Sequence, residues 1–164
     1  MTAHAATVAD LADTVCAYVP VSTEPGSVAL LDTLLSEGVT VLLPVTRQGI
    51  DGAPEPLWWG AYRPGQLVPG RFGLREPSGP HLPPITVAKA GVVLVPALAV
   101  DRSGVRLGRG AGFYDRSLPL CRSATRLIAM VRDEEVVDKL PGEPHDVRMT
   151  DVLTPARGLV ALGE

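Results

Sequence analysis

Short apolar runs, each bounded by glycine, proline or polar residues, recur along the 164-residue chain. Runs of this length and composition predict buried β-strands. The strands expected in this way cover 15–19, 39–43, 91–96, 126–131 and 151–154, with a further strand at an edge of the sheet over 57–62. The run 91–96 has the strongest signal, and its apolar continuation predicts a strand that extends to Asp101. Residues 63–84 are rich in proline and glycine and predict mostly loop.

Helical patterns lie between these runs. Four leucines at helical spacing predict a helix over 28–37, with Ser27 as its N-cap and Gly38 as its stop. The segment 6–14 has the pattern of the end of an amphipathic helix, and another helix is expected after Gly112. Strand–helix–strand units with short links imply parallel strands. The chain is therefore predicted to be an α/β protein, a three-layer sandwich with a mainly parallel central sheet.

The composition is that of a globular protein. A hydrophobic fraction of 46% excludes a disordered chain, and the length predicts one domain, 1–164, with a sizeable core. No apolar run reaches membrane-spanning length and no signal-peptide pattern is present, so we expect a cytoplasmic protein with no membrane partner. The two cysteines, Cys16 and Cys121, lie far apart in the sequence and predict buried, inert thiols.

Charge is distributed unevenly along the chain. The formal net charge of −3 argues against a nucleic-acid partner. No lysine or arginine occurs before Arg47, whereas five acidic residues do, so the first 46 residues carry a formal charge of −5. Any bound anion must therefore be held mainly by the rest of the chain.

The segment RLGRGAGFYDR, residues 106–116, is the strongest candidate for chemistry. Glycines at every second position disfavour a helix or strand up to Gly112 and predict a loop whose N–H groups form an anion-binding concavity. Three arginines in the segment suit phosphate oxygens, and Asp115 suits a magnesium ion bound with them. An arginine-rich surface turn is the alternative. The loop follows the strand 92–95 by about ten residues, and this places it at the carboxyl rim of the sheet and favours phosphate binding.

Four segments in the same order resemble the 5-formyltetrahydrofolate cyclo-ligase family, also called methenyltetrahydrofolate synthetases. The most specific is VPALAVDRSGVRLGRGAGFYDRSL, residues 95–118. The others are AYVPVSTEPGSVALLDTLLSEGVTVLLPV (17–45), FGLREP (72–77) and LPGEPHDVRMTDVLTP (140–155). The resemblance implies a Rossmann-like fold of the NagB/RpiA/CoA transferase-like type. It also implies an ATP-dependent cyclisation of 5-formyltetrahydrofolate to 5,10-methenyltetrahydrofolate, with release of ADP and phosphate.

The resemblance also implies roles for individual residues. It assigns Arg109 and Asp115 to catalysis, and Val19, Glu24 and Arg109 to the folate substrate. It assigns magnesium to Asp115 and Asp151. It assigns ATP to one continuous stretch: Arg106, Leu107, Gly108, Arg109, Gly110, Ala111, Gly112, Phe113 and Tyr114. The implied partners are therefore 5-formyltetrahydrofolate and Mg-ATP, and we expect a monomer or weak homo-oligomer.

The residues alone leave other readings open. Asp115 is equally suited to capping a helix, and Asp151 to a surface position at a strand edge. Glu24 before Pro25 is typical of a solvated turn, and Tyr114 of a packing residue.

The sequence also departs from the family, because the basic N-terminal helix that the family uses to reach the ATP phosphates has no counterpart before Arg47. A start downstream of the natural one, cations from a partner, or a degraded paralogue are the alternatives. The competing functions are then a non-catalytic folate- or nucleotide-binding relative and, less well supported, a sugar-phosphate or acyl-CoA enzyme.

Overall fold

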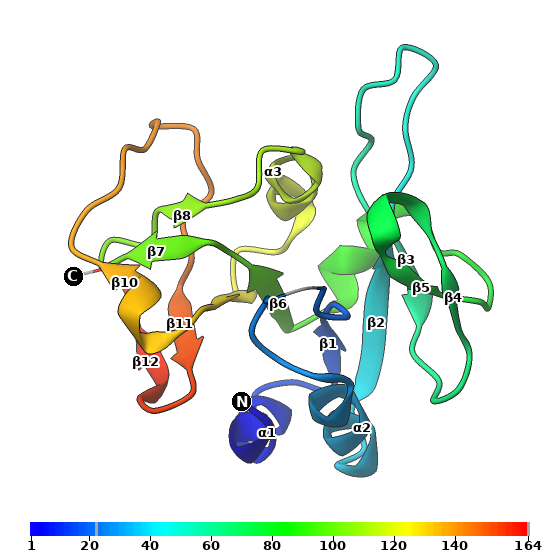
Figure 1. Cartoon of the computed structure of the whole chain (residues 1–164), viewed down its shortest axis with the longest axis horizontal. Helices are drawn as coiled ribbons and strands as arrows, with labels where there is room; N and C mark the ends of the chain where they lie inside the picture. Colours follow the sequence, from blue (N-terminus) through cyan, green and yellow to red (C-terminus); the bar gives the residue numbers. More distant parts are fainter. Residues whose placement is uncertain (22, 164) are drawn as a thin grey trace.

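A seven-stranded, mainly parallel sheet forms the centre of the computed structural model, which describes residues 1–21 and 23–163. Its strand order is β12–β11–β9–β6–β1–β2–β3 (Figure 1). The five inner strands are parallel: β1 (Thr14–Cys16), β2 (Thr40–Val45), β6 (Val92–Pro96), β9 (Arg126–Met130) and β11 (Asp151–Thr154). The two edges are antiparallel: β3 (Trp58–Ala61) and β12 (Gly158–Ala161). The prediction of a mainly parallel sheet with a strand near 57–62 at its edge is confirmed.

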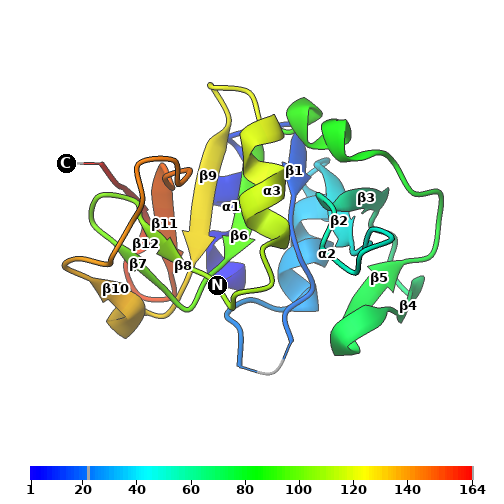
Figure 2. The same ribbon diagram turned by 90° about the horizontal axis from the view of Figure 1, so that it is seen from above.

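Helices cover both faces of this sheet, as the three-layer prediction required. The helices α1 (Ala5–Ala9) and α2 (Val28–Ser36) lie on one face, and α3 (Phe113–Ser117) lies on the other (Figures 1 and 2). Because successive side chains of a strand point to opposite faces of the sheet, alternate strand residues pack in two separate hydrophobic cores, one on each face. In β6, for example, Leu94 packs in the core with α2, whereas Val95 packs in the core with α3.

The predicted boundaries of α2 are confirmed nearly to the residue. The Ser27 hydroxyl accepts a hydrogen bond from the Leu30 N–H at 3.3 Å, as an N-cap does. Gly38 has a φ of +85°, a left-handed conformation that glycine adopts without strain, and there the chain leaves the helix.

One prediction about the strands was wrong. The strand over 91–96 does not continue to Asp101, because the ladder ends at Pro96, which has no N–H to extend it. The chain then enters a separate three-stranded sheet made of β7 (Ala99–Asp101), β8 (Arg106–Leu107) and β10 (Val136–Val137). The region 63–84 is mostly loop and turn, as predicted, although it also contains the antiparallel pair β4 (Leu67–Pro69) and β5 (Arg75–Pro77). The remaining elements are short 3₁₀ turns: η1 (Thr2–His4), η2 (Arg71–Gly73), η3 (Pro84–Lys89), η4 (Leu118–Leu120) and η5 (Asp133–Glu135).

The buried Asp101 carboxylate holds the turn that leads into the glycine-rich segment. Its Oδ1 accepts hydrogen bonds from Ser103 N (2.9 Å), Ser103 Oγ (2.8 Å) and Val105 N (3.0 Å), and its Oδ2 accepts one from Leu140 N (2.9 Å). Burial by itself raises the pKa of Asp101, but these hydrogen bonds outweigh burial and lower it. The charged form of this side chain is therefore part of the fold.

We expect Asp101→Asn to lower the free energy of unfolding at pH 7 by about 1–3 kcal/mol, because an amide N–H₂ would then face the Leu140 N–H. For a chain of this length the melting temperature should fall by about 2–10 °C. Since folding lowers the pKa of Asp101, its stabilisation is present above the ordinary aspartate pKa of about 4 and is lost as the pH falls through the folded value. Thermal unfolding at a series of pH values should therefore show the two proteins converging in acid. A difference that persists there would contradict this account.

Candidate active site

A cavity of about 250 Å³ lies at the carboxyl ends of β1, β2 and β6. Strand β1 is followed by α2 and β2, whereas β6 is followed by α3 and β9, which lies on its other side in the sheet. The loops that leave these two neighbouring strands therefore diverge, and such a point in a parallel sheet is where ligands bind. The lining comes from five segments of the chain: Tyr18, Val19, Val21, Glu24; Pro44, Thr46, Leu57; Phe72, Leu74, Arg75; Pro96, Ala97; and Arg106 with Gly108–Asp115.

The glycine-rich segment forms one wall of this cavity. Eight of the nine residues assigned to ATP line it; Leu107 does not. The loop is also shorter than predicted, since Arg106 and Leu107 form β8 and the Leu107 carbonyl accepts a hydrogen bond from Leu98 N at 2.8 Å. Gly112 has a φ of +84°, a left-handed conformation that favours glycine where the loop turns into α3.

Arg106 and Asp115 form an ion pair at the base of the loop. The Arg106 guanidinium is nearly buried and donates from Nη2 to Asp115 Oδ1 at 2.9 Å and from Nη1 to the Pro96 carbonyl at 3.2 Å. The Asp115 side chain is 76% exposed, so its second oxygen is free to take a ligand at the edge of the cavity. No side chain caps α3, so the helix-cap reading of Asp115 is not observed.

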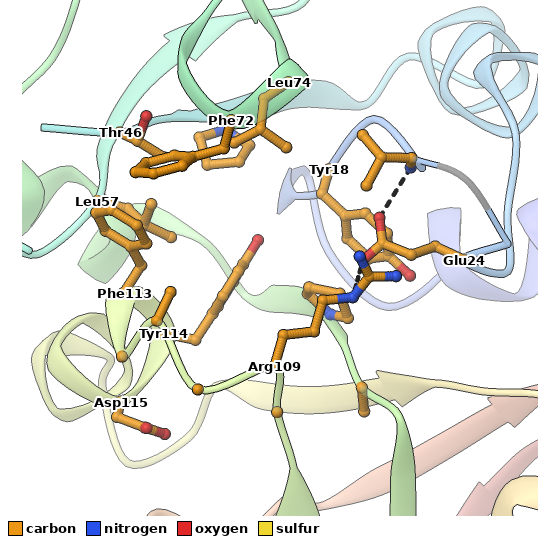
Figure 3. A pocket seen from close by; sticks show the side chains of 18 of the residues that line it. Tyr18, Glu24, Thr46, Leu57, Phe72, Leu74, Arg109, Phe113, Tyr114 and Asp115 are labelled. Atoms are coloured by element: carbon orange, nitrogen blue, oxygen red, sulfur yellow. Dashed lines mark hydrogen bonds and ion pairs between the residues drawn. The ribbon is translucent and has the colours of Figure 1, made fainter.

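Glu24 reaches the same cavity from the opposite wall. Its Oε1 accepts a hydrogen bond from Val21 N at 2.8 Å, and its Oε2 lies 3.8 Å from Arg109 Nε (Figure 3). The Glu24 side chain is only 12% exposed, so it is not the solvated turn acid that its local sequence suggests. The structure thus brings Val19, Glu24 and Arg109 together from positions about 90 residues apart in the chain.

The other end of the cavity is apolar, and sequence reasoning missed it. Leu57, Phe72, Leu74 and Phe113 gather there (Figure 3). The rings of Phe72 and Phe113 meet edge to face, with centroids 6.1 Å apart. Phe72 has a φ of +58°, a strained value for a residue other than glycine. The only signal in the sequence was the turn-like FGLREP, which gave no reason to place this ring beside Phe113.

Two tyrosines stand between these ends. The Tyr18 hydroxyl donates to the Pro25 carbonyl at 3.2 Å. The Tyr114 hydroxyl is buried and has no hydrogen-bond partner within 1–21 and 23–163. Burial raises the pKa of both phenols well above the ordinary value, and nearby Glu24 adds to the effect, so both remain protonated at neutral pH.

Asp151 does not join this site. It begins β11, does not line the cavity, and binds both Nε (2.8 Å) and Nη2 (2.6 Å) of Arg126. Burial raises its pKa, but hydrogen bonds from Arg126 and Thr150 outweigh burial and lower it. The predicted pairing of Asp151 with Asp115 around magnesium therefore has no support in this geometry.

The described part of the chain has no group of three or more histidine, cysteine, aspartate or glutamate side chains that could hold a metal. Asp115 alone still fits magnesium, because this ion is commonly bound by one or two carboxylates together with the phosphates of a nucleotide. Within that same part, no helix has the length and apolarity needed to cross a membrane.

Comparisons with known proteins agree on one family. Residues 1–155 match the model of the 5-formyltetrahydrofolate cyclo-ligase family. The chain is similar to the 5-formyltetrahydrofolate cyclo-ligase of Mycolicibacterium smegmatis, with 65% identity over 149 residues, which are 91% of this chain and 77% of the relative. The Escherichia coli K12 cyclo-ligase is 30% identical over 90% of this chain and 80% of its own.

Solved structures agree with the sequence relatives. The NMR structure of Aquifex aeolicus 5,10-methenyltetrahydrofolate synthetase superimposes with a TM-score of 0.72 at 25% identity, covering 93% of this chain and 73% of that one. The Mycoplasma pneumoniae 5,10-methenyltetrahydrofolate synthetase, at 17% identity and a TM-score of 0.63, shares the fold over 90% of this chain and 80% of its own.

Proposed function

This chain belongs to the 5-formyltetrahydrofolate cyclo-ligase family, and we propose that it uses ATP to close 5-formyltetrahydrofolate into 5,10-methenyltetrahydrofolate. The formyl oxygen attacks the γ-phosphorus of ATP and ADP leaves. N10 then attacks the phosphorylated carbon and loses its proton, and the former formyl oxygen departs as phosphate. The observation that carries the proposal is the 65% identity to the M. smegmatis cyclo-ligase over 91% of this chain.

The glycine-rich wall suits the triphosphate end of ATP. Residues Gly108 to Tyr114 line the cavity, and they supply main-chain N–H groups together with the Arg109 side chain. These donors and this positive charge can stabilise the negative charge on a phosphoryl group during its transfer. Phosphorylation turns the formyl oxygen from a poor leaving group into a good one. The protein's part in this step is to fix the γ-phosphate against the formyl oxygen.

Glu24 and Val19 suit the pteridine end of the folate. A carboxylate that is 12% exposed and held by Val21 N is oriented to accept N–H groups of a flat heterocycle. Arg109 lies beside Glu24 and on the glycine-rich loop, so its guanidinium stands between the two substrates. We assign it to the formyl oxygen and the γ-phosphate together.

Magnesium belongs with Asp115 in this proposal. Asp115 would hold the ion, which would supply positive charge to offset part of the charge of the phosphates. The exposed carboxylate at the cavity edge fits that role. We do not assign Asp151 to the ion, because Arg126 occupies both of its oxygens.

Asp151→Asn should therefore affect stability and leave magnesium dependence unchanged. Removing the charge leaves Arg126 without its acid, and because Arg126 is partly exposed we expect a loss of about 1–3 kcal/mol. Thermal unfolding and a titration of activity against magnesium concentration separate the two roles. A magnesium constant raised tenfold, with an unchanged melting temperature, would restore Asp151 as a ligand.

Absorbance at the methenyl product band tests the function directly. Wild-type protein with 5-formyltetrahydrofolate and Mg-ATP should form product and ADP in equal amounts, and omitting either substrate should abolish both. Binding of nucleotide or folate without product would instead identify the non-catalytic relative. We also expect a cytoplasmic protein that is a monomer or weak homo-oligomer, and light scattering after size-exclusion chromatography tests the second point.

A further inference from the structure

Among the buried side-chain polar atoms of residues 1–21 and 23–163, only the Tyr114 hydroxyl both belongs to a residue that lines the cavity and has no hydrogen-bond partner. Two buried side-chain polar atoms lack a partner in the described ranges, Trp59 Nε1 and Tyr114 OH. Trp59 lies in the edge strand β3 and does not line the cavity, whereas Tyr114 does. Figure 3 shows the Tyr114 phenol pointing from α3 into the space between the apolar end and the Glu24–Arg109 pair.

A buried hydroxyl without a partner costs folding free energy, because it gives up its hydrogen bonds to water. Because Tyr114 lines the cavity, a molecule bound there can satisfy this hydroxyl. Burial keeps the hydroxyl protonated, and the Arg106 guanidinium, 5.8 Å from the ring centroid, does not reverse this. Tyr114 therefore offers a neutral O–H donor to a bound molecule.

The surroundings select the kind of acceptor. Arg106 and Glu24 both act on Tyr114, and the positive charge of Arg106 is the stronger of the two, so charge alone does not exclude a phosphate oxygen; the apolar lining distinguishes the acceptors. A neutral carbonyl oxygen on a flat, mostly apolar ring fits better between Phe72, Leu57 and Glu24. A pteridine carries such an oxygen at C4, next to the N–H that a carboxylate accepts.

We propose that the Tyr114 hydroxyl donates a hydrogen bond to the C4 carbonyl oxygen of the folate pteridine. This inference rests on the proposed function, and it separates two parts of one residue. The main chain of Tyr114 stays with the glycine-rich loop and ATP, while its side chain recognises the folate. Tyr114 is then a specificity residue that distinguishes a 4-oxo ring from a 4-amino ring.

Tyr114→Phe tests the proposal by removing one oxygen. We expect KM for 5-formyltetrahydrofolate to rise about tenfold, with kcat and KM for ATP unchanged, because this bond is equally present in the ground and transition states. The melting temperature should stay the same or rise, since the variant loses an unsatisfied group. The wild type should bind the 4-amino analogue less tightly than the substrate, and Tyr114→Phe should reduce this preference about tenfold, with the remainder due to Glu24 at the neighbouring N–H.

Tyr62→Phe is the control, because its hydroxyl is partly buried and donates to Asp32 Oδ1 at 2.6 Å, away from the cavity. It should lower the melting temperature and leave the KM for folate unchanged. A raised KM for ATP in Tyr114→Phe, a reduced kcat, or a lowered melting temperature would each overturn the proposal. A raised KM for ATP would mean that the hydroxyl binds the nucleotide, and a reduced kcat that it binds the reacting formyl oxygen. A lowered melting temperature would mean that it makes a hydrogen bond within the protein. An unchanged KM for folate would overturn it too. Turnover by the wild type keeps these outcomes distinct from a failure of the proposed function.

Discussion

Arg109→Ala is expected to lower kcat/KM for 5-formyltetrahydrofolate by about 10³-fold, because it removes the guanidinium proposed to meet both the formyl oxygen and the γ-phosphate. The Arg109 side chain is 49% exposed and lies on a loop, so the melting temperature should barely change. Steady-state kinetics with both substrates and thermal unfolding of the same preparations measure the two effects.

Two further variants sharpen this result. Arg109→Lys keeps the positive charge but loses the planar pair of donors, so its activity should lie between those of the wild type and the alanine variant. Arg122→Ala removes an exposed arginine outside the cavity and should leave kcat/KM unchanged. If Arg109→Ala retained more than about a tenth of wild-type activity, electrostatic stabilisation by Arg109 would be too small to call it catalytic.

Asp115→Asn should lower kcat by about 10²–10³-fold at fixed magnesium, because the loss of the carboxylate weakens the proposed hold on the ion that neutralises the phosphates. Excess magnesium should restore part of the activity. Asp115 is exposed, but the Arg106 guanidinium that it pairs with is nearly buried, so we also expect a loss of about 1–3 kcal/mol in the free energy of unfolding.

The control for this prediction is Glu134→Gln, which neutralises an exposed acid far from the glycine-rich loop in the sequence. It should change neither kcat nor the apparent magnesium constant. Unaltered magnesium dependence in Asp115→Asn would remove Asp115 from the metal site. The role of Asp115 would then be its ion pair with Arg106.

Local sequence signals predicted the elements that local interactions define. Ser27 and Gly38 set the ends of α2 through a hydrogen bond and a dihedral angle within a few residues, so both ends could be predicted from the sequence. The end of β6 at Pro96 could also have been predicted from the sequence. The apolar residues that follow, however, belong to a second sheet whose pairing with Val136 is set by the tertiary fold.

The candidate site likewise contains some features that local sequence predicts and others that depend on the tertiary fold. The glycine-rich loop follows from its own composition, and the Glu24 turn was found through the family resemblance. The ion pair that engages Asp151 joins residues 25 apart through the parallel alignment of β9 and β11, which no local pattern encodes. Phe72 reaches Phe113 only because β4 and β5 fold as a hairpin within a region whose composition predicts loop.

The small volume of the cavity limits how much of each reactant it can enclose. About 250 Å³ is less than most pockets that enclose one whole ligand. On the proposed function, a nucleotide and a folate would therefore share it by inserting only their reacting ends. We then expect the adenosine of one and the glutamyl end of the other to lie outside the cavity, so chemical tags attached at those outer ends should leave turnover intact.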